Sequence, residues 1–262
     1  MKRIKKFIFV IMLMIPFIAN ASSPEEETFV KVAEEIKYIK TTSIINNSSV
    51  MRNADLEEMS SISIEVSKEE FDNAPTTSEP IESTSSRALA EVGTETTYKR
   101  LTTTIERSST YYRYTTNLYW KNIPSMRSYD IIAIGHYGDV EPYSSNGIVF
   151  TQDYCRTSTS CYGSGGSGYK VTDYGTVQVF HLPENTLVSL EQTMSFVVKK
   201  AVSWTITAQK AAGDYAHATS AVTAALALNN ASIGVAGLVL NDNIYDYYDT
   251  TPAAITTYNV SW

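Results

Sequence analysis

The sequence predicts an all-β protein, folded as an antiparallel β-sandwich, on three observations. The chain has 262 residues, 43% of them hydrophobic and 11% aromatic, which is enough for one substantial core. It contains 30 Thr and 18 Tyr, and both residue types favour strands. Beyond residue 97, apolar and polar residues alternate in successive runs, which is the pattern of strands with one buried and one solvated face.

The formal net charge is -7, from 21 Lys and Arg against 28 Asp and Glu. Nucleic-acid binding depends on a basic surface, so no nucleic-acid partner is expected. The acidic residues are concentrated in residues 22–98, which carry 16 Asp and Glu against 6 Lys and Arg. Charge and pattern together divide the chain into three predicted parts, residues 1–21, 22–96 and 97–262.

Residues 1–21 have the organisation of a secretory signal peptide. Four basic residues precede an apolar run from Phe7 to Ile18, and Ala19-Asn20-Ala21 places small residues where signal peptidase reads them. The apolar run is shorter than the roughly 20 residues of a membrane-spanning helix. The sequence therefore predicts a secreted, extracellular protein that begins near Ser22.

Residues 22–96 are predicted to be an acidic, largely disordered stalk or pro-region. At its start, Glu25, Glu26 and Glu27 precede apolar residues at helical spacing, which predicts one short helix over residues 25–40. From residue 41 to 95, apolar residues are scattered among Ser, Thr, Glu, Asn and Pro, a composition typical of disorder.

Residues 97–262 are predicted to form the sandwich domain. Apolar and polar residues alternate through Thr110–Lys121, Val188–Val198 and Val202–Ala208, which predicts three amphipathic strands. The run Tyr129–His136 is almost continuously apolar and predicts an inner strand. Further strands complete about eight to ten, the number and spacing of a sandwich, and they are expected over 171–182, 231–240 and 255–262.

The segment Ala218–Leu240 carries no charged residue. A membrane-spanning helix is disfavoured because Asn229 and Asn230 would lie at the bilayer centre and no basic cluster follows. A buried hairpin that turns at Asn229-Asn230 fits better. A membrane-inserting hairpin stays open as an alternative, because Val222, Leu226 and Leu228 alternate with small residues.

Cys155 and Cys161 are the only two cysteines. In an oxidising compartment they are expected to pair and to stiffen one surface loop, with two free thiols as the alternative. Zinc needs about four ligands, and no His lies near the two cysteines, so this is no zinc site.

The sequence predicts no catalytic residue, no cofactor and no metal site. The three histidines, His136, His181 and His217, show neither protease nor metal spacing. Acidic residues gather around His136, with Asp139 and Glu141, and again at Asp242, Asp246 and Asp249, but neither run matches a calcium-binding loop. A secreted hydrolase that uses loop carboxylates near His136 remains one hypothesis.

Tyrosines are the more suggestive feature. Seventeen of the 18 lie between Tyr98 and Tyr258. An exposed Tyr offers a large rigid surface with a polar tip, which can stack on a sugar ring or anchor an interface. The candidate binding residues, on predicted loops or exposed strand faces, are Tyr111, Tyr137, Tyr143, Tyr245, Tyr247 and Tyr248.

Four motifs carry a resemblance to known sequences: YKRLTTTIE, NLYWKNIPSMRS, YDIIAIGH (Tyr129–His136) and YAHAT (Tyr215–Thr219). Over roughly residues 98–248 the chain resembles a group of secreted proteins of Gram-positive bacteria to which no activity is assigned. The resemblance implies one extracellular β-rich domain behind a signal peptide. The acidic region before residue 97 and the CRTSTSC segment depart from the group.

Three hypotheses for the function follow. The first is a secreted, non-enzymatic interaction module whose Tyr-bearing loops bind a cell-wall polymer, a glycan or an extracellular host protein. The second is a membrane-active protein that inserts residues 218–240. The third is the hydrolase that uses loop carboxylates.

Overall fold

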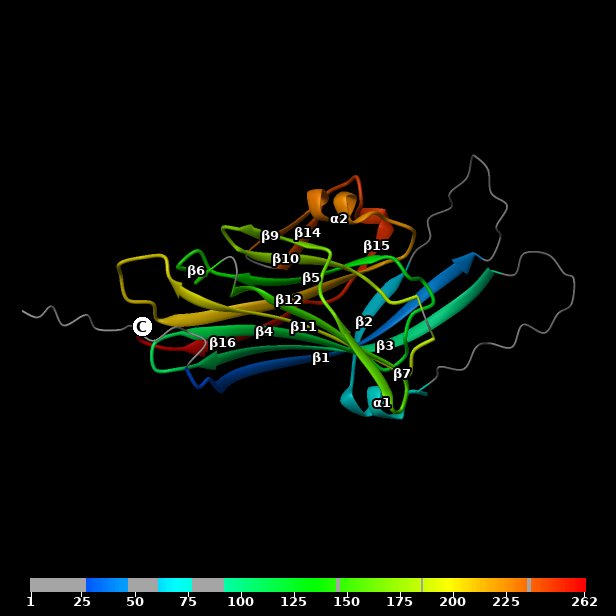
Figure 1. Cartoon of the computed structure of the whole chain (residues 1–262), viewed down its shortest axis with the longest axis horizontal. Coiled ribbons are helices and arrows are strands. Elements are labelled where there is room, and N and C mark those ends of the chain that lie inside the picture. The colour runs from blue at the N-terminus through cyan, green and yellow to red at the C-terminus, as the bar shows by residue number, and fades with distance from the viewer. Residues whose placement is uncertain (1–26, 47–60, 77–91, 145–146, 185, 235–236) are drawn as a thin grey trace, which may run out of the picture.

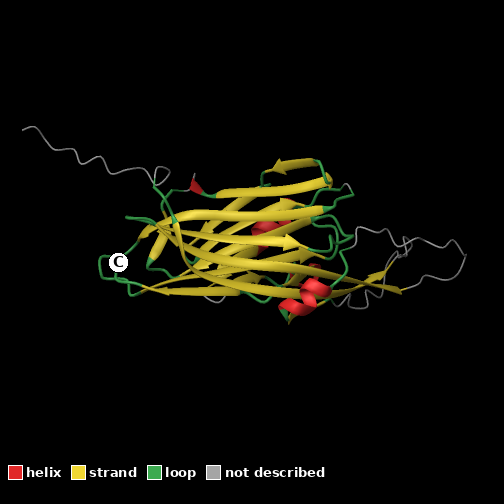
Figure 2. Cartoon of the chain, turned by 90° about the horizontal axis from the view of Figure 1, so that it is seen from below, coloured by secondary structure: helices red, strands yellow, loops and turns green. Residues whose placement is uncertain are grey.

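The computed structural model describes residues 27–46, 61–76, 92–144, 147–184, 186–234 and 237–262. The predicted signal peptide lies outside these residues. The described part confirms an antiparallel β-sandwich with few helices (Figures 1 and 2). Every strand pairing in it is antiparallel, as expected for a chain of alternating amphipathic strands.

The larger sheet has the strand order β2-β1-β3-β4-β11-β7-β8, with β6 paired to β11. Its strands are β1 (Val30–Asn46), β2 (Ile62–Val66), β3 (Val92–Arg107), β4 (Tyr112–Trp120), β6 (Val140–Pro142), β7 (Val149–Thr157), β8 (Ser160–Ser164) and β11 (Ser189–Lys200).

The smaller sheet has the order β15-β12-β5-β10-β9, with β16 paired to β12. Its strands are β5 (Tyr129–His136), β9 (Gly168–Thr172), β10 (Gly175–His181), β12 (Ala208–Ala218), β15 (Tyr248–Thr250) and β16 (Ala254–Asn259). A separate hairpin joins β13 (Ala231–Gly234) to β14 (Gly237–Leu240).

Two helices and a short 3-10 turn complete the described elements: α1 (Lys68–Asn73), α2 (Ala224–Asn230) and the 3-10 helix Tyr245–Tyr247. The Ser67 side chain caps α1 by accepting a hydrogen bond from the backbone N–H of Glu70, and Thr223 caps α2 in the same way through Leu226. Within the described residues, no helix has both the length and the apolar character needed to cross a membrane.

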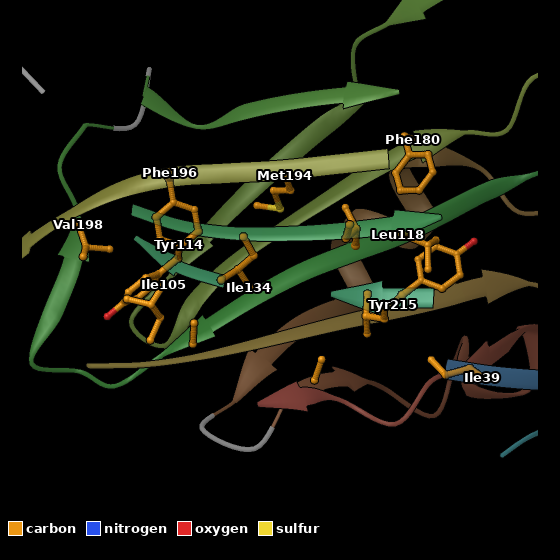
Figure 3. Packing of buried hydrophobic residues seen from close by; sticks show 14 of the residues in the cluster. Ile39, Ile105, Tyr114, Leu118, Ile134, Phe180, Met194, Phe196, Val198 and Tyr215 are labelled. Atoms are coloured by element: carbon orange, nitrogen blue, oxygen red, sulfur yellow. The ribbon is translucent and has the colours of Figure 1, made fainter. Parts of the chain in front are cut away.

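The main core lies between the two sheets (Figure 3). It is filled by the inward side chains of alternating strands, among them Tyr114, Leu118, Met194 and Phe196. Strands β4 and β11 show the predicted pattern, with every second residue buried. Their amphipathic alternation therefore places one face on the core and one on solvent.

A second apolar cluster covers the opposite face of the smaller sheet. Ile131 and Ala133 of β5 pack there with residues of α2 and β13, such as Ala227 and Ile233. Strand β5 is consequently buried on both faces, which is why its sequence is almost continuously apolar. The prediction of an inner strand is confirmed.

Five predictions about elements are wrong. Within the expected helix 25–40, the described residues 27–40 form no helix: Val30–Asn46 is the long strand β1, paired with β3 along its whole length. Residues 202–207 contain no strand, and β12 begins only at Ala208. Asn229-Asn230 ends helix α2 instead of turning a hairpin. Residues 171–182 are divided by a turn between β9 and β10. Residues 231–240 likewise form two strands, β13 and β14, where one was expected.

The acidic region is part of the sandwich wherever the structure describes it. Strands β1 and β2 extend the larger sheet beyond β3, and α1 packs beside β1. The expected boundary near residue 97 falls inside β3, which is hydrogen-bonded to β1 on both sides of that residue. The prediction of disorder is therefore wrong for residues 27–46, 61–76 and 92–96, and residues 22–26, 47–60 and 77–91 lie outside the described part.

Candidate functional site

A groove of about 450 Å³ lies on the larger sheet beside the disulfide hairpin. It spans strands β4, β11, β7 and β8. Its lining residues are Tyr119, Asp153, Tyr154, Cys155, Cys161, Tyr162, Gly163, Ser189 and Glu191. Two carboxylates and three tyrosines thus line one groove.

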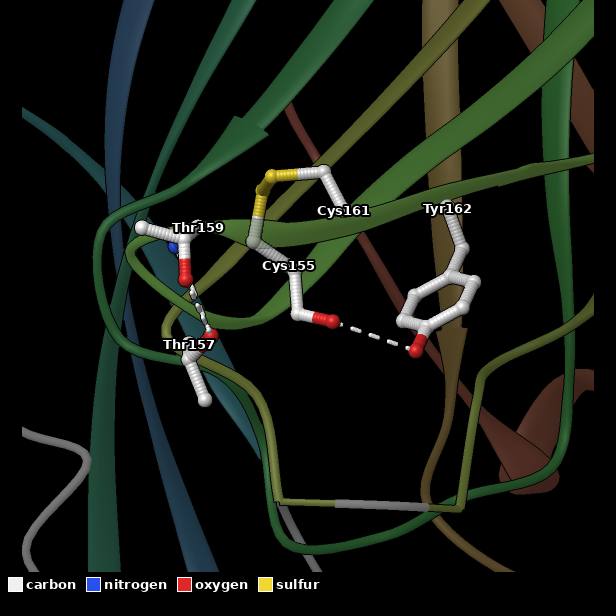
Figure 4. Close-up of a disulfide and its surroundings, with 6 residues drawn as sticks. Cys155, Thr157, Thr159, Cys161 and Tyr162 are labelled. Atoms are coloured by element: carbon white, nitrogen blue, oxygen red, sulfur yellow. Dashed lines mark hydrogen bonds between the residues drawn. A yellow bond between two sulfur atoms is a disulfide. The ribbon is translucent and has the colours of Figure 1, made fainter.

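The wall of the groove is the β7–β8 hairpin. Cys155 and Cys161 are directly opposite each other in the strand register and form the predicted disulfide (Figure 4). The hairpin closes at Thr157 and Ser160 over a two-residue turn, in which the Thr159 N–H donates to Thr157 Oγ1. The covalent bond fixes the end of the hairpin and with it one side of the groove.

The floor of the groove is one cross-strand row. Tyr119 is in register with Glu191, Glu191 with Asp153, and Asp153 with Gly163. Residues in register share a face of the sheet, and this row alternates with the core row of Trp120, so it faces solvent. The guanidinium of Arg100 extends the row and lies 5.2 Å from the centre of the Tyr119 ring.

The two carboxylates of this row lie opposite each other on adjacent strands. Asn117 Nδ2 donates to Glu191 Oε1 at 2.6 Å and to Thr193 Oγ1 at 2.8 Å, which orients the Glu191 side chain. Like charges placed directly opposite in a sheet repel and reduce stability. An arrangement that costs stability on an exposed face points to a binding role.

Gly163 keeps the Asp153 carboxylate accessible. A Cβ atom at this position would lie 3.2 Å from Asp153 Oδ1. Glycine therefore leaves open the space beside the carboxylate at the β8 side of the row.

Tyr154 and Tyr162 flank the disulfide within the hairpin. They are in register, and their rings stack with centres 5.6 Å apart. In Figure 4 the Tyr162 ring lies on the opposite side of the hairpin from the disulfide, and its hydroxyl is 3.2 Å from Ser160 Oγ. The Arg156 guanidinium covers the same ring at 4.9 Å. The exposed Tyr162 ring therefore lies on the other face of the hairpin from the row of Tyr119, Glu191 and Asp153.

The six tyrosines expected to bind do not form one surface. Tyr111 and Tyr143 contact each other edge to face, with ring centres 5.1 Å apart. Tyr137 is exposed, and the ammonium of Lys210 lies 5.0 Å from its ring and donates to its hydroxyl. Tyr245 and Tyr247 are exposed on the 3-10 helix, which precedes β15 and lies away from β6 in Figure 1.

The expected exposure of Tyr248 is wrong. This side chain is only 7% exposed and packs in the second apolar cluster. Its hydroxyl donates to the backbone carbonyl of Tyr129 at 2.7 Å, and burial raises its pKa. As the first residue of β15, Tyr248 anchors that strand to β5.

A second hollow, of about 530 Å³, lies at the end of β5, between β6 and the β9–β10 turn. His136 lines it, and so does Glu141. The His136 ring is buried, Nδ1 is 2.8 Å from the Tyr137 carbonyl oxygen, and burial lowers the pKa of the imidazole. Glu141 is paired with Lys199 at 3.1 Å.

The second acidic run is dispersed by the fold. Asp249 is buried between the sheets, whereas Asp242 and Asp246 are exposed. Within the described ranges, no three His, Cys, Asp or Glu residues are grouped closely enough to hold a metal ion.

The groove was not predicted from the sequence, although one signal was present. Asp-Tyr-Cys and Cys-Tyr-Gly are arranged symmetrically about the short CRTSTSC segment, so a hairpin with paired cysteines also pairs the two tyrosines. Tyr119 and Glu191 carry no such signal, because they join the site only through strand register. Searches of family models, curated proteins and solved structures return no match for this chain.

Proposed function

We propose that the protein is a secreted binding module that holds a glycan in the groove beside the β7–β8 hairpin. The observation that carries the proposal is the solvent-facing row of Tyr119, Glu191 and Asp153. A sugar ring presents an apolar face, which stacks on an aromatic ring, and hydroxyl groups, which donate to carboxylates.

The surroundings of the row suit an extended polymer. Beyond it on the same face, Asn117 and Thr193 supply further polar groups. A disulfide is typical of a protein exported to an oxidising compartment, where cell-wall polymers and host glycans are encountered.

The test is binding of the purified mature protein to immobilised cell-wall polysaccharides and to a glycan array, followed by titration calorimetry. Tyr119→Ala and Glu191→Gln are expected to weaken binding by about tenfold each, the loss that corresponds to about 1.4 kcal/mol. Tyr245→Ala and Tyr247→Ala remove exposed tyrosines outside the groove and serve as matched controls. Groove variants that bind like the unmodified protein, or controls that lose binding, would refute the proposal.

Glycan hydrolysis is a second candidate because Glu191 and Asp153 face each other. Retaining glycosidases use two carboxyl groups about 5 Å apart, and opposite residues in a sheet have Cβ atoms at a similar spacing. Product release from the bound polymer, abolished in both Asp153→Asn and Glu191→Gln, would identify this activity. If the polymer is bound but not cleaved, the protein is a binding module and not a hydrolase.

The structure of residues 218–240, where it is described, does not support the hypothesis of membrane insertion. Val222, Ala227 and Ile233 of this segment are packed in the second apolar cluster, against the smaller sheet. We therefore do not propose it.

A further inference from the structure

An ionic centre is buried between the two sheets, remote from the groove floor because it lies on the inner face. The Lys99 side chain has no exposed surface, and its Nζ donates to Asp249 Oδ2 at 3.3 Å. Lys99 comes from β3 of the larger sheet and Asp249 from β15 of the smaller sheet. The pair thus spans the core.

Aromatic rings enclose the Lys99 amine. Its Nζ lies 5.1 Å from the centre of the Trp120 ring and 5.3 Å from that of Tyr215. Both rings are fully buried. Water is therefore excluded from the side of the amine that does not face Asp249.

A second buried carboxylate belongs to the same centre. Asp130 accepts hydrogen bonds from the Tyr215 hydroxyl and, at 2.9 Å, from the Ala218 N–H, and His217 Nδ1 lies 3.0 Å away. His217 is in register with Asp249. Asp130, His217 and Asp249 therefore follow one another on the inner face of the smaller sheet.

A buried ion pair adds little stability, because the free energy needed to desolvate two charges is about as large as the free energy of their attraction. Burial lowers the pKa of Lys99, and the nearby carboxylates Asp249 and Asp130 oppose this only in part. An amine of lowered pKa more readily gives its proton to a neighbouring carboxylate. The centre then holds an uncharged nucleophile against a carboxylic acid.

We propose that Lys99 and Asp249 are joined by an intramolecular amide bond that forms once the chain has folded. Lys99 Nζ lies 3.3 Å from Asp249 Oδ2, so the amine is already held against the carboxyl group that it would attack. The bond would covalently link the two sheets. This inference stands on the ionic centre alone and does not depend on glycan binding.

The reaction balances without any co-reactant. One proton passes from the Lys99 ammonium to the Asp249 carboxylate, and the neutral Nζ attacks Cγ. The new N–C bond forms, a C–O bond breaks, and a second proton from the nitrogen departs with the leaving hydroxyl as water. Asp130, whose charge acts on Lys99, relays this second proton.

The surroundings of Asp249 offer the released water a way out. Ser63 Oγ donates to Asp249 Oδ2 at 2.8 Å, and Thr41 Oγ1 lies 3.2 Å from the same oxygen. Ser63 is on the edge strand β2 and is only partly buried. Water leaving past Ser63 drives the condensation forward, because a dry core prevents its reversal.

The experiment is mass spectrometry of the intact, purified chain after reduction of the disulfide. We expect a mass below that of the sequence by one water molecule. A tryptic digest is expected to give one branched peptide that joins Lys99 to Asp249, with no cleavage after Lys99. A full sequence mass in the folded protein would overturn the proposal.

Two variants sharpen the result. Lys99→Met with Asp249→Leu replaces the pair by apolar side chains and is expected to fold with its full mass. Asp130→Asn keeps both partners but is expected to slow the loss of water at least tenfold in a protein that is folded by circular dichroism. Water loss from Asp130→Asn at the unmodified rate would overturn the relay. A link that hydroxylamine cleaves would be an ester from Ser63 or Thr41, and it would overturn the assignment to Lys99.

Discussion

Asp153 lines the groove, and its charge is expected to lower the stability of the folded protein. It faces Glu191 across β7 and β11, and opposed like charges in a sheet are unfavourable. Asp153→Asn removes this repulsion and keeps the side-chain shape. We expect the free energy of unfolding to rise by about 0.5 kcal/mol while glycan binding weakens. Urea denaturation and calorimetric binding measure the two effects separately.

The control is Asp242→Asn, which removes an exposed acid on the loop after β14. It is expected to change neither quantity. If Asp153→Asn lowered the stability, the carboxylate would be a structural hydrogen-bond acceptor and the functional interpretation would be contradicted.

Asp214 is a buried acid that is expected to make the stability of the protein depend on pH. Its carboxylate accepts hydrogen bonds from the backbone N–H groups of Tyr215 and Leu238, and so holds β14 against β12. Burial nevertheless dominates and raises its pKa to about 6, against an ordinary value of 3.8. The folded protein therefore binds this proton more tightly than the unfolded chain does.

The sign of the pH dependence follows from this difference. A folded-state pKa above the unfolded value gives stability that is complete below about pH 4 and is lost as the pH rises through about 6. Two pKa units correspond to about 3 kcal/mol. We expect Asp214→Asn to flatten the stability profile between pH 4 and 7, as measured by urea denaturation at each pH. If the stability of Asp214→Asn still fell with pH as steeply as that of the unmodified protein, another group would be responsible for the pH dependence.

Among the elements, β12 packs closely against the larger sheet at Gly213. A Cβ atom at Gly213 would overlap the hydroxyl groups of Thr103 and Thr116, a buried register pair on β3 and β4. Gly213→Ala is therefore expected to push the sheets apart and to lower the stability by about 1–3 kcal/mol.

Thermal unfolding followed by circular dichroism measures this change. Gly138→Ala is the matched control, because a Cβ atom there would meet no atom within 4 Å. Equal melting temperatures for the two variants would show that the sheets tolerate the added methyl group at Gly213.

The strands that could be predicted are those whose own sequence alternates or is continuously apolar, such as β4, β11 and β5. The prediction for residues 25–40 is wrong because Val32, Ile36 and Ile39 fit helical spacing, while long-range pairing with β3 decides the structure. The alternation over 202–207 was equally misleading: Trp204 is 60% exposed in a loop.

The sites depend on register, which no local pattern specifies. The disulfide was predictable because only two cysteines exist. Tyr119, Glu191 and Asp153 come from three strands that are distant in sequence, as do Lys99 and Asp249. In the sequence, Lys99 is an unremarkable charge in a polar stretch, and only the packing of the second sheet shows that it is buried.

At the scale of the whole molecule, the groove, the cover of the smaller sheet and the ionic centre lie in different places. The outer face of the larger sheet carries the groove, helix α2 and the β13–β14 hairpin cover the outer face of the smaller sheet, and the ionic centre lies between the sheets. Strands β1 and β2 supply Thr41 and Ser63 to that centre. Where it is described, the acidic region is therefore part of both the sandwich and the ionic centre.

The proposed amide bond makes a prediction about the stability of the whole molecule. Lys99 and Asp249 are 150 residues apart in the sequence, and they belong to different sheets. Closing a loop of that length restricts the unfolded chain and stabilises the folded state by about 5 kcal/mol. Replacing a buried ion pair by apolar residues of similar size is often neutral or favourable. An unlinked ion pair would thus leave the double variant Lys99→Met/Asp249→Leu as stable as the unmodified protein.

If the amide bond is present, the unmodified protein is expected to be more stable than the double variant. The linked protein is expected to resist urea better than the double variant by about 5 kcal/mol, with the disulfide intact in both. The slope of the free energy against urea is also expected to be smaller for the linked protein, because its unfolded chain stays more compact and exposes less surface. Equal midpoints and equal slopes would show that the two sheets are held together by packing alone.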